Sequence, residues 1–263
     1  MKEILFPALA IGAVGLVLGA LLAVASKIFA VEKNEKAEEI AEVLPGANCG
    51  SCGYAGCSAY AEAISQGGAK INCCSPGGQA VSDKIAEIMG LTAETVEEKV
   101  AVICCAGTDE NAVSKYNYEG MEDCVAVSRL QGGGEKACAF GCLGHGSCAN
   151  VCSRGAITMK DGIAVVDKDK CGGCGECAEI CPKKVIKIVP KNSKYVVKCQ
   201  SCDKGALMKD KCTVGCIGCK ICEKNCPVGA ITVTDNHAVI DYDKCIGCGV
   251  CAEKCPKKII IEM

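Results

Sequence analysis

The sequence predicts one N-terminal transmembrane helix followed by several small α+β domains built around cysteine-rich loops. Three observations support this fold class. No charged residue occurs between Ile4 and Ser26. Cysteine accounts for 27 of the 263 residues, whereas tryptophan is absent and phenylalanine occurs three times. In the C-terminal half the cysteine pattern repeats, so that Cys152 recurs as Cys226, 74 residues later.

The uncharged segment is long enough to cross a membrane. Its 23 residues would span roughly 34 Å as a helix, and the hydrocarbon core of a bilayer is about 30 Å thick. A cleaved signal peptide is the alternative, because Ala23-Val24-Ala25 resembles a cleavage site, but the apolar stretch is longer than a signal peptide needs. Cleavage would also place a thiol-rich chain in an oxidising compartment. We therefore expect a retained single-pass anchor over residues 1–31 in the cytoplasmic membrane, with the cysteine domains on the cytoplasmic side.

Features in and after the anchor indicate what surrounds it. Gly15 and Gly19 form a small-residue pattern that lets another transmembrane helix pack closely, and the alternative is that glycine is simply common in membrane helices. A single helix has no route for ions through it, which implies membrane partner subunits. Residues 32–44 are rich in charge and predict a solvated helical spacer, which ends at Pro45-Gly46. The formal net charge of −2 gives no electrostatic support for nucleic-acid binding.

A first cysteine group lies in a predicted domain of residues 45–103. Its members follow the spacing C-x2-C-x4-C-x16-C and are Cys49, Cys52, Cys57 and Cys74. Glycines between them allow the loop to wrap closely around a bound group, and four thiolates from one compact segment can complete a 4Fe-4S cluster. Structural zinc is the alternative, because C-x2-C loops also bind zinc. The chain length and the odd cysteine count disfavour a disulfide scaffold.

Each unit of the repeat carries the run C-x2-C-x2-C-x3-C-P that is typical of bacterial ferredoxins. In that arrangement three closely spaced cysteines bind one cluster, and the fourth reaches across to a second cluster. We therefore predict two duplicated ferredoxin-like modules, residues 138–190 and 191–263, with short strands between the loops. Three cluster sites follow from this rule, namely Cys171, Cys174 and Cys177 with Cys152; Cys245, Cys248 and Cys251 with Cys226; and Cys216, Cys219 and Cys222 with Cys255.

The first loop of the repeat, CAFGCLGHGSC at residues 138–148, departs from this pattern. A shift of 74 residues aligns His145 with Cys219, so this loop lacks one cysteine of the standard run. Three ligands of a further cluster remain, and these are Cys142, Cys148 and Cys181. We predict that Cys138, on a slightly wider loop, supplies the missing thiolate. Ligation through the imidazole of His145 is the alternative.

Six more cysteines have no partner in these patterns, namely Cys104, Cys105, Cys124, Cys199, Cys202 and Cys212. The first three lie in a connecting segment, residues 104–137. Cys212 occupies the position that matches Cys138, although its own module already has four ligands for each cluster. Position 138 could therefore belong to an extra site as well. The cysteines predict five 4Fe-4S clusters and suffice for a sixth or more, and buried free cysteines are the alternative for the surplus.

The order of these segments resembles the RnfB family, the iron–sulfur subunit of the Rnf ion-translocating electron-transport complex, over essentially the whole chain. The family spacing selects Cys74, not Cys73, as the fourth ligand of the first group. The extended ferredoxin region with surplus cysteines is similar to versions from strict anaerobes. The resemblance implies that electrons from reduced ferredoxin pass through 4Fe-4S clusters to membrane subunits. It also implies that the complex couples ferredoxin–NAD⁺ electron transfer to Na⁺ or H⁺ transport.

The resemblance implies specific partners as well: other membrane and peripheral Rnf-type subunits, soluble reduced ferredoxin and membrane lipid, but no nucleic acid. The sequence has no dinucleotide fingerprint, P-loop or Ser-His-Asp arrangement. This favours a relay subunit of a translocating oxidoreductase without substrate-bond chemistry of its own. The alternatives are an iron–sulfur subunit of another membrane dehydrogenase or hydrogenase, and a membrane-tethered zinc or thiol-storage protein.

Lysine is concentrated in residues 183–224, which contain eleven lysines and three acidic residues. Bacterial ferredoxins are typically acidic, so this segment could steer the electron donor toward the distal clusters. Candidate contacts are Lys191, Lys194 and Lys198. An ordinary solvated surface is the alternative.

Overall fold

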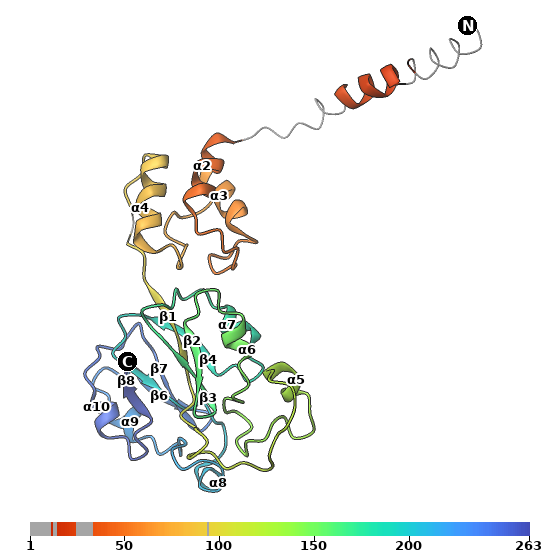
Figure 1. The fold of residues 1–263 in the computed structure, drawn as a ribbon. Coiled ribbons are helices and arrows are strands. Elements are labelled where there is room, and N and C mark those ends of the chain that lie inside the picture. The colour runs from red at the N-terminus through yellow and green to blue at the C-terminus, as the bar shows by residue number, and fades with distance from the viewer. Residues whose placement is uncertain (1–11, 13–14, 25–33, 94) are drawn as a thin grey trace, which may run out of the picture.

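The computed structural model describes residues 12, 15–24, 34–93 and 95–263. A short helical stretch at residues 15–24 stands apart from the rest, and a small helical unit and a larger body with strands follow it (Figure 1). Within these described ranges, no helix combines the length and the apolar character needed to span a bilayer. The predicted span over residues 4–26 lies in large part outside the described residues.

The small helical unit is built from three helices, which are α2 (Glu35–Val43), α3 (Cys57–Ser65) and α4 (Gly78–Met89). They enclose a core in which Ile40, Tyr60 and Ile85 are each at most 1% exposed. The helix expected as a solvated spacer, α2, is thus a wall of this unit. Its apolar side, with Ile40 and Leu44, is buried because it packs against α3 and α4.

The larger body contains four two-stranded antiparallel sheets. Their strands are β1 (Lys99–Ile103) with β4 (Ile186–Pro190), β2 (Ile157–Lys160) with β3 (Ile163–Val166), β5 (Tyr195–Val197) with β8 (Ile260–Glu262), and β6 (Ile231–Thr234) with β7 (His237–Ile240). Short helices lie between them, namely α5 (Cys124–Ser128), α6 (Ser147–Asn150), α7 (Glu176–Ile180), α8 (Gly205–Met208), α9 (Ile221–Lys224) and α10 (Val250–Glu253).

Sulfur replaces the large side chains that such small sheets would otherwise need. The core of the first module includes Ile157, Ala164 and Val185 together with several cysteines, and the second module is built in the same way. A two-stranded sheet is only marginally stable by itself, so each module depends on what its cysteines surround.

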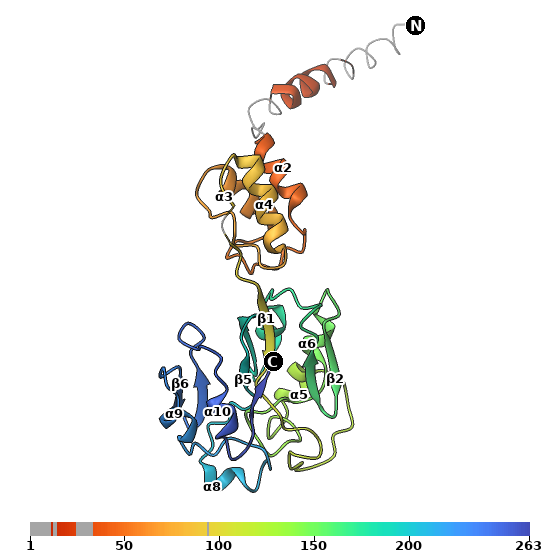
Figure 2. The ribbon, with the colours of Figure 1, turned by 90° about the vertical axis from the view of Figure 1, so that its left-hand side faces the viewer.

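The 74-residue repeat is visible in the backbone. The hairpin β2–β3 pairs Ile157 with Val166, and the hairpin β6–β7 pairs Ile231 with Ile240. A second sheet in each module brings together its first and last strands, β1 with β4 and β5 with β8. The first module therefore begins at residue 99, inside the segment that we expected to close the four-cysteine domain. Figure 2 shows β1 leading from the helical unit into the larger body.

Candidate iron–sulfur sites

In the second module the structure brings together both predicted ligand sets. One pocket is lined by Cys216, Cys219, Cys222 and Cys255. A second pocket is lined by Cys226, Cys245, Cys248 and Cys251. Gly247 and Gly249 have φ of 67° and 79°, values that let the loop between the last three cysteines turn tightly before α10 begins.

Backbone amides in this module point at sulfur. The amide of Ala230 donates to Cys226 Sγ at 3.2 Å. Burial opposes ionisation of Cys226, but amide donors, that of Val228 foremost, outweigh it and lower the pKa of the thiol. Burial raises the pKa of Cys222 to about 11, and the neighbouring thiols of Cys216, Cys219 and Cys255 add to this increase. Several thiolates close together repel one another, so the pocket suits a cationic group that several sulfurs can share.

The first module holds an equivalent of each site. Ala156 donates its amide to Cys152 Sγ at 3.3 Å, which repeats the contact between Ala230 and Cys226. Burial raises the pKa of Cys177 to about 12, and its neighbours Cys174, Cys171 and Cys152 add to this increase. The structure thus brings together the predicted set of residues 152, 171, 174 and 177.

The second pocket of this module differs from the prediction. It is lined by Cys142, Cys148 and Cys181, and its fourth cysteine is Cys124. Cys138 lies in another pocket, between the modules. The structure therefore favours Cys124 over Cys138 as the fourth sulfur of this site.

Local contacts explain how a residue from the connecting segment reaches this pocket. Asp123 caps α5, because its Oδ1 accepts the amide of Ala126 at 2.7 Å. Ser147, at the start of α6, accepts the amide of Cys124 at 2.7 Å and donates to Asp123 Oδ2 at 3.0 Å. These bonds fasten the start of α5 to the loop that carries Cys142 and Cys148. In the sequence, the aspartate that precedes Cys124 indicates a helix start but not the partner of that helix.

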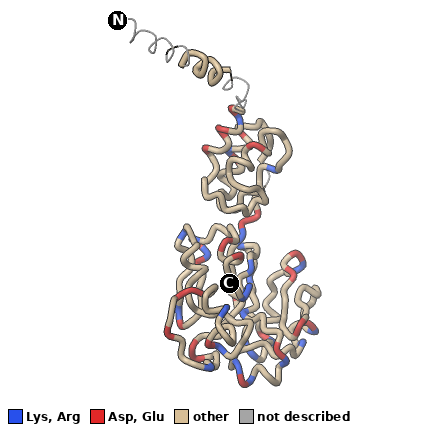
Figure 3. Tube along the Cα trace, turned by 90° about the vertical axis from the view of Figure 1, so that its right-hand side faces the viewer, with Lys and Arg blue, Asp and Glu red and all other residues tan. Residues whose placement is uncertain are grey.

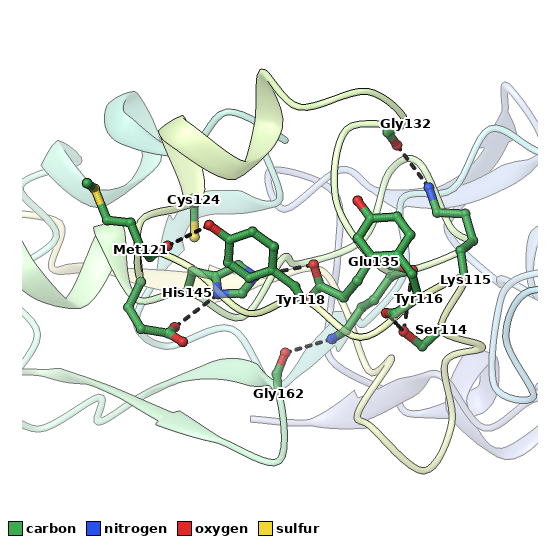
Figure 4. A network of polar contacts seen from close by, with 12 residues as sticks. Ser114, Lys115, Tyr116, Tyr118, Met121, Cys124, Gly132, Glu135, His145 and Gly162 are labelled. Carbon is green, nitrogen blue, oxygen red and sulfur yellow. Dashed lines mark hydrogen bonds and ion pairs between the residues drawn. The ribbon is translucent and has the colours of Figure 1, made fainter.

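His145 does not offer a free nitrogen for metal ligation. Its Nδ1 lies 3.0 Å from Glu122 Oε2 and its Nε2 lies 3.2 Å from Glu135 Oε2, and the edge-on ring of Tyr118 lies 5.0 Å away (Figure 4). Burial lowers the pKa of the imidazole, but hydrogen bonds to both carboxylates outweigh burial and raise it overall. The imidazole thus joins Glu122, two residues before Cys124, to the loop where the cysteine is missing.

The four-cysteine group of the helical unit also converges. Burial raises the pKa of Cys74, and the neighbouring Cys57, Cys52 and Cys49 add to this effect. The buried Tyr60 hydroxyl donates to the carbonyl of Lys70 at 2.6 Å and accepts the amide of Cys73 at 3.1 Å. Tyr60 thereby holds the segment that carries Cys74 against α3.

The helical unit meets the first module through its cysteine loops. A cavity of about 490 Å³ is lined by Cys52, Cys73 and Cys174. After burial and Glu176, Cys49 contributes to the raised pKa of Cys174, so these two thiols are neighbours across the boundary. Arg154 also donates to the carbonyl of Pro76 at 2.9 Å.

Four of the surplus cysteines line a pocket between the two modules together with Cys138, and these are Cys104, Cys105, Cys199 and Cys212. In the parts of the chain that the structure describes, no three His, Cys, Asp or Glu side chains meet closely enough to bind a single metal ion. The thiols instead surround wider pockets with apolar walls. Thiolate sulfur is the usual ligand of iron–sulfur clusters, so the donor sets fit this group.

Comparison with known proteins gives these pockets a context. Residues 44–76 match the FeS family model of an Fe-S cluster, residues 164–187 a 4Fe-4S binding domain, and residues 215–259 a 4Fe-4S dicluster domain. The chain is 43% identical over 245 residues to a subunit of the Na⁺-translocating ferredoxin:NAD⁺ oxidoreductase complex of Acetobacterium woodii, and the match covers 93% of this chain and 73% of the relative. It is 42% identical to a subunit of the ion-translocating oxidoreductase complex of Methanosarcina acetivorans, with 93% of both chains covered.

The chain belongs to the RnfB family of ion-translocating oxidoreductase subunits. A subunit of the proton-translocating ferredoxin:NAD⁺ oxidoreductase complex of Clostridium ljungdahlii is also 42% identical, over 87% of this chain and 81% of the relative. Membership of this family confirms the resemblance inferred from the order of the cysteine groups. The matches to cluster-binding families likewise confirm an iron–sulfur protein with ferredoxin-like domains.

Proposed function

We propose that the chain relays electrons from reduced ferredoxin to membrane subunits of an Rnf complex, in which ferredoxin–NAD⁺ electron transfer is coupled to Na⁺ or H⁺ transport. The single observation that carries this proposal is the succession of cysteine pockets. They begin in the helical unit and continue through both ferredoxin modules. A bound 4Fe-4S cluster supplies a one-electron carrier at each pocket.

Five ligand sets are assigned by this proposal. They are Cys49, Cys52, Cys57 and Cys74; Cys152, Cys171, Cys174 and Cys177; Cys124, Cys142, Cys148 and Cys181; Cys216, Cys219, Cys222 and Cys255; and Cys226, Cys245, Cys248 and Cys251. The third set contains Cys124 in place of Cys138.

The neighbouring thiols give the relay its order. Cys49 and Cys174 are electrostatic neighbours, which joins the helical unit to the first module. Within that module burial raises the pKa of Cys148 to about 12, and Cys177 of the other set is among its further causes. The apolar walls of the pockets exclude water and hold the sulfurs in fixed directions, so little rearrangement is needed during transfer.

The second module is the proposed receiver of electrons. Cys219 and Cys248 are exposed ligands of its two sites, and exposed Lys220 directly follows Cys219. Positive side chains near these thiols would attract an acidic ferredoxin. Lysines occur over much of the larger body (Figure 3). Of the three candidates named from the sequence, Lys194 is exposed, Lys191 pairs with Glu98 at 2.9 Å, and Lys198 is partly buried.

The membrane side of the proposal concerns the N-terminus. We propose that residues 4–26 anchor the chain in the cytoplasmic membrane among lipid and other Rnf-type subunits, with the cluster domains in the cytoplasm. In the described part of this segment, Leu16 and Leu22 are 77% and 70% exposed, which suits contact with lipid or with a partner helix. The helical stretch also stands clear of the folded domains (Figure 1).

Iron and acid-labile sulfide analysis of anaerobically purified protein tests the proposal. We expect a brown protein with about four iron and four sulfide ions for each site, hence about twenty or more iron ions per chain. The bound clusters should be reduced by reduced ferredoxin, as followed by electron paramagnetic resonance. A colourless protein that contains zinc and no iron would contradict the proposal.

A further inference from the structure

We infer that Cys105, Cys138, Cys199 and Cys212 form a sixth 4Fe-4S site, which lies between the two ferredoxin modules. The inference rests on the proposed function, because it assumes that the other cysteine pockets hold clusters. It adds a ligand set that neither module contains by itself. All four cysteines line one pocket.

Two of the four residues occupy equivalent places after equivalent strands. Cys105 follows the end of β1 by two residues, and Cys199 follows the end of β5 by two residues. The amide of Cys142 donates to Cys105 Sγ at 3.4 Å, and the amide of Cys216 donates to Cys199 Sγ at 3.3 Å. Cys142 and Cys216 are related by the 74-residue repeat, so these two hydrogen bonds are equivalent in the two modules.

The other two residues belong to matched loops. Cys138 and Cys212 each begin a C-x2-G-C sequence, and they are themselves related by the repeat. The amide of Gly141 donates to the carbonyl of Cys138 at 3.4 Å, and that of Gly215 donates to the carbonyl of Cys212 at 3.5 Å. Each module thus contributes one cysteine after a strand and one cysteine at the start of a loop.

The sulfurs surround one space. A methyl group on Gly141 would lie 3.7 Å from both Cys105 Sγ and Cys138 Sγ. On Gly107 it would lie 3.5 Å from Cys105 Sγ and 3.8 Å from Cys212 Sγ. Burial raises the pKa of Cys199 to about 12, and Cys138 in the opposite module is among the further causes. Because Gly107 and Gly141 carry no side chain, they leave free the space beside these sulfurs, which come from both modules.

This space is as large as the pockets of the other sites. Its cavity volume is about 20 Å³, the same as that of the three pockets that contain Cys148, Cys222 and Cys251. Cys104 also lines this pocket, and the other four cysteines match in number the four cysteines of each of those three pockets. A bound cluster of the same kind would fit all four.

Two lysines supply positive charge around this pocket. Lys136 is 7% exposed, and its Nζ donates to the carbonyls of Gly107 at 2.8 Å and Gly162 at 2.6 Å. Lys198 is partly buried and lines the same pocket. Burying an ammonium group is costly unless negative charge lies near it. A cluster held by four thiolates is anionic and would supply that charge.

The position of the site completes the path between the modules. In the first module, Cys105 accepts a hydrogen bond from the amide of Cys142, which lines the pocket of Cys124. In the second module, Cys199 accepts one from the amide of Cys216, which lines the pocket of Cys219. A cluster here would shorten the electron step from one module to the other.

The test compares the full-length C105S/C199S variant with wild type and with C202S, after anaerobic purification. Cys202 is a suitable control because it is partly buried in the same segment and does not line the pocket. Native mass spectrometry and iron and sulfide analysis should show that the double variant loses about four iron and four sulfide ions per chain. The C202S variant should lose none. C138A/C212A should show the same loss as C105S/C199S.

Measurements on wild type keep the test independent of variant folding. We expect about twenty-four iron ions per chain and protection of Cys105, Cys138, Cys199 and Cys212 from alkylation until the clusters are removed. About twenty iron ions together with rapid alkylation of these four thiols would overturn this inference and leave the proposed function standing. A wild-type chain without iron would overturn both.

Discussion

The two ferredoxin modules have the same strand pairing, but they complete one of their sites differently. In the second module the three loop cysteines of the pocket come from one run, and Cys219 is the middle one. In the first module His145 stands at that position, and Cys124 approaches from the connecting segment. A cysteine pocket can thus draw one of its four cysteines from a distant segment while its strands and the remaining cysteines stay in place.

The exchange accompanies an insertion. Cys105 and Cys138 lie 33 positions apart in the first module, whereas Cys199 and Cys212 lie 13 positions apart in the second. The additional residues include Glu122 and Cys124, and they cover the loop around His145. Cys124 is buried, whereas Cys219, which completes the matching pocket of the second module, is exposed; the other loop cysteines, Cys142 and Cys148 in the first module and Cys216 and Cys222 in the second, are buried in both. The first module is suited to an internal position in the relay and the second to contact with a soluble donor.

The largest expected effect is the loss of a whole cluster from the exchanged site. Cys124→Ser should remove about four iron ions per chain, because it takes away one of four thiolates at a buried pocket. Cys219→Ser should weaken the matching site of the second module by the same mechanism. Iron analysis and native mass spectrometry would measure both losses. If Cys124→Ser kept its full iron content, Cys124 would not be the exchanged ligand.

The next effect concerns His145, which occupies in the first module the position of Cys219 in the second. His145→Gln should lower stability by about 1 kcal/mol, because partly buried hydrogen bonds to two carboxylates are lost. The folded-state pKa of His145 is raised, so its contribution is complete below the unfolded-state pKa of about 6.5 and is lost as pH rises through the folded-state value. Melting curves recorded with cluster absorbance should therefore differ most near pH 6 and converge at higher pH.

The control for this effect is His237→Gln, since His237 is a hairpin residue of the second module whose Nδ1 lies 3.3 Å from the carbonyl of Asp235. Its melting temperature should stay close to that of wild type. Equal pH dependence of wild type and His145→Gln would show that the two carboxylates do not hold a charged imidazole.

A smaller effect is expected at the cap of α5. Asp123→Ala should cost about 1 kcal/mol of stability, because it removes the acceptor for Ala126 and a partner of Ser147. Cluster loss on exposure to a chelator should become faster at the site of Cys124 and stay unchanged in the second module. Asp210→Ala, at an exposed position, is the control. Uniform loss from both modules would argue against a local role of the cap.

The smallest effect concerns the donor. Reversing Lys220 and Lys224 to glutamate should slow reduction by ferredoxin by about threefold to tenfold at low salt and less at high salt, because these charges act mainly on the association rate. Reversing Lys160 and Lys168 in the first module is the matched control. Stopped-flow reduction at several salt concentrations would measure both. Equal rates for the two double variants would remove the distinction between a receiving module and an internal one.

The sequence was most informative where ligands are local. The C-x2-C-x2-C run and its repeat predicted the sets around Cys177, Cys222 and Cys251, because a short loop with glycines can reach one cluster only from its own neighbourhood. Sequence patterns could not place Cys124, since its position depends on hydrogen bonds between α5 and α6, which are distant in the chain. They also could not pair Cys105 with Cys142, which depends on how β1 leaves one domain to complete the sheet of the next.

The helix α2 shows a different limit. Its charged residues predicted a solvated spacer, but one apolar stripe is enough to bury Ile40 against α3 and α4. The charges remain outside and the helix still forms a wall of the four-cysteine unit.

Electron paramagnetic resonance of the anaerobically purified wild-type chain, reduced stepwise by reduced ferredoxin, tests the central claim most directly. If the cysteine pockets form a continuous relay, the signals of reduced iron–sulfur clusters should appear and broaden through interaction between neighbours as more sites are filled. A chain that gives sharp, independent signals, or that contains zinc and gives no signal, would contradict it.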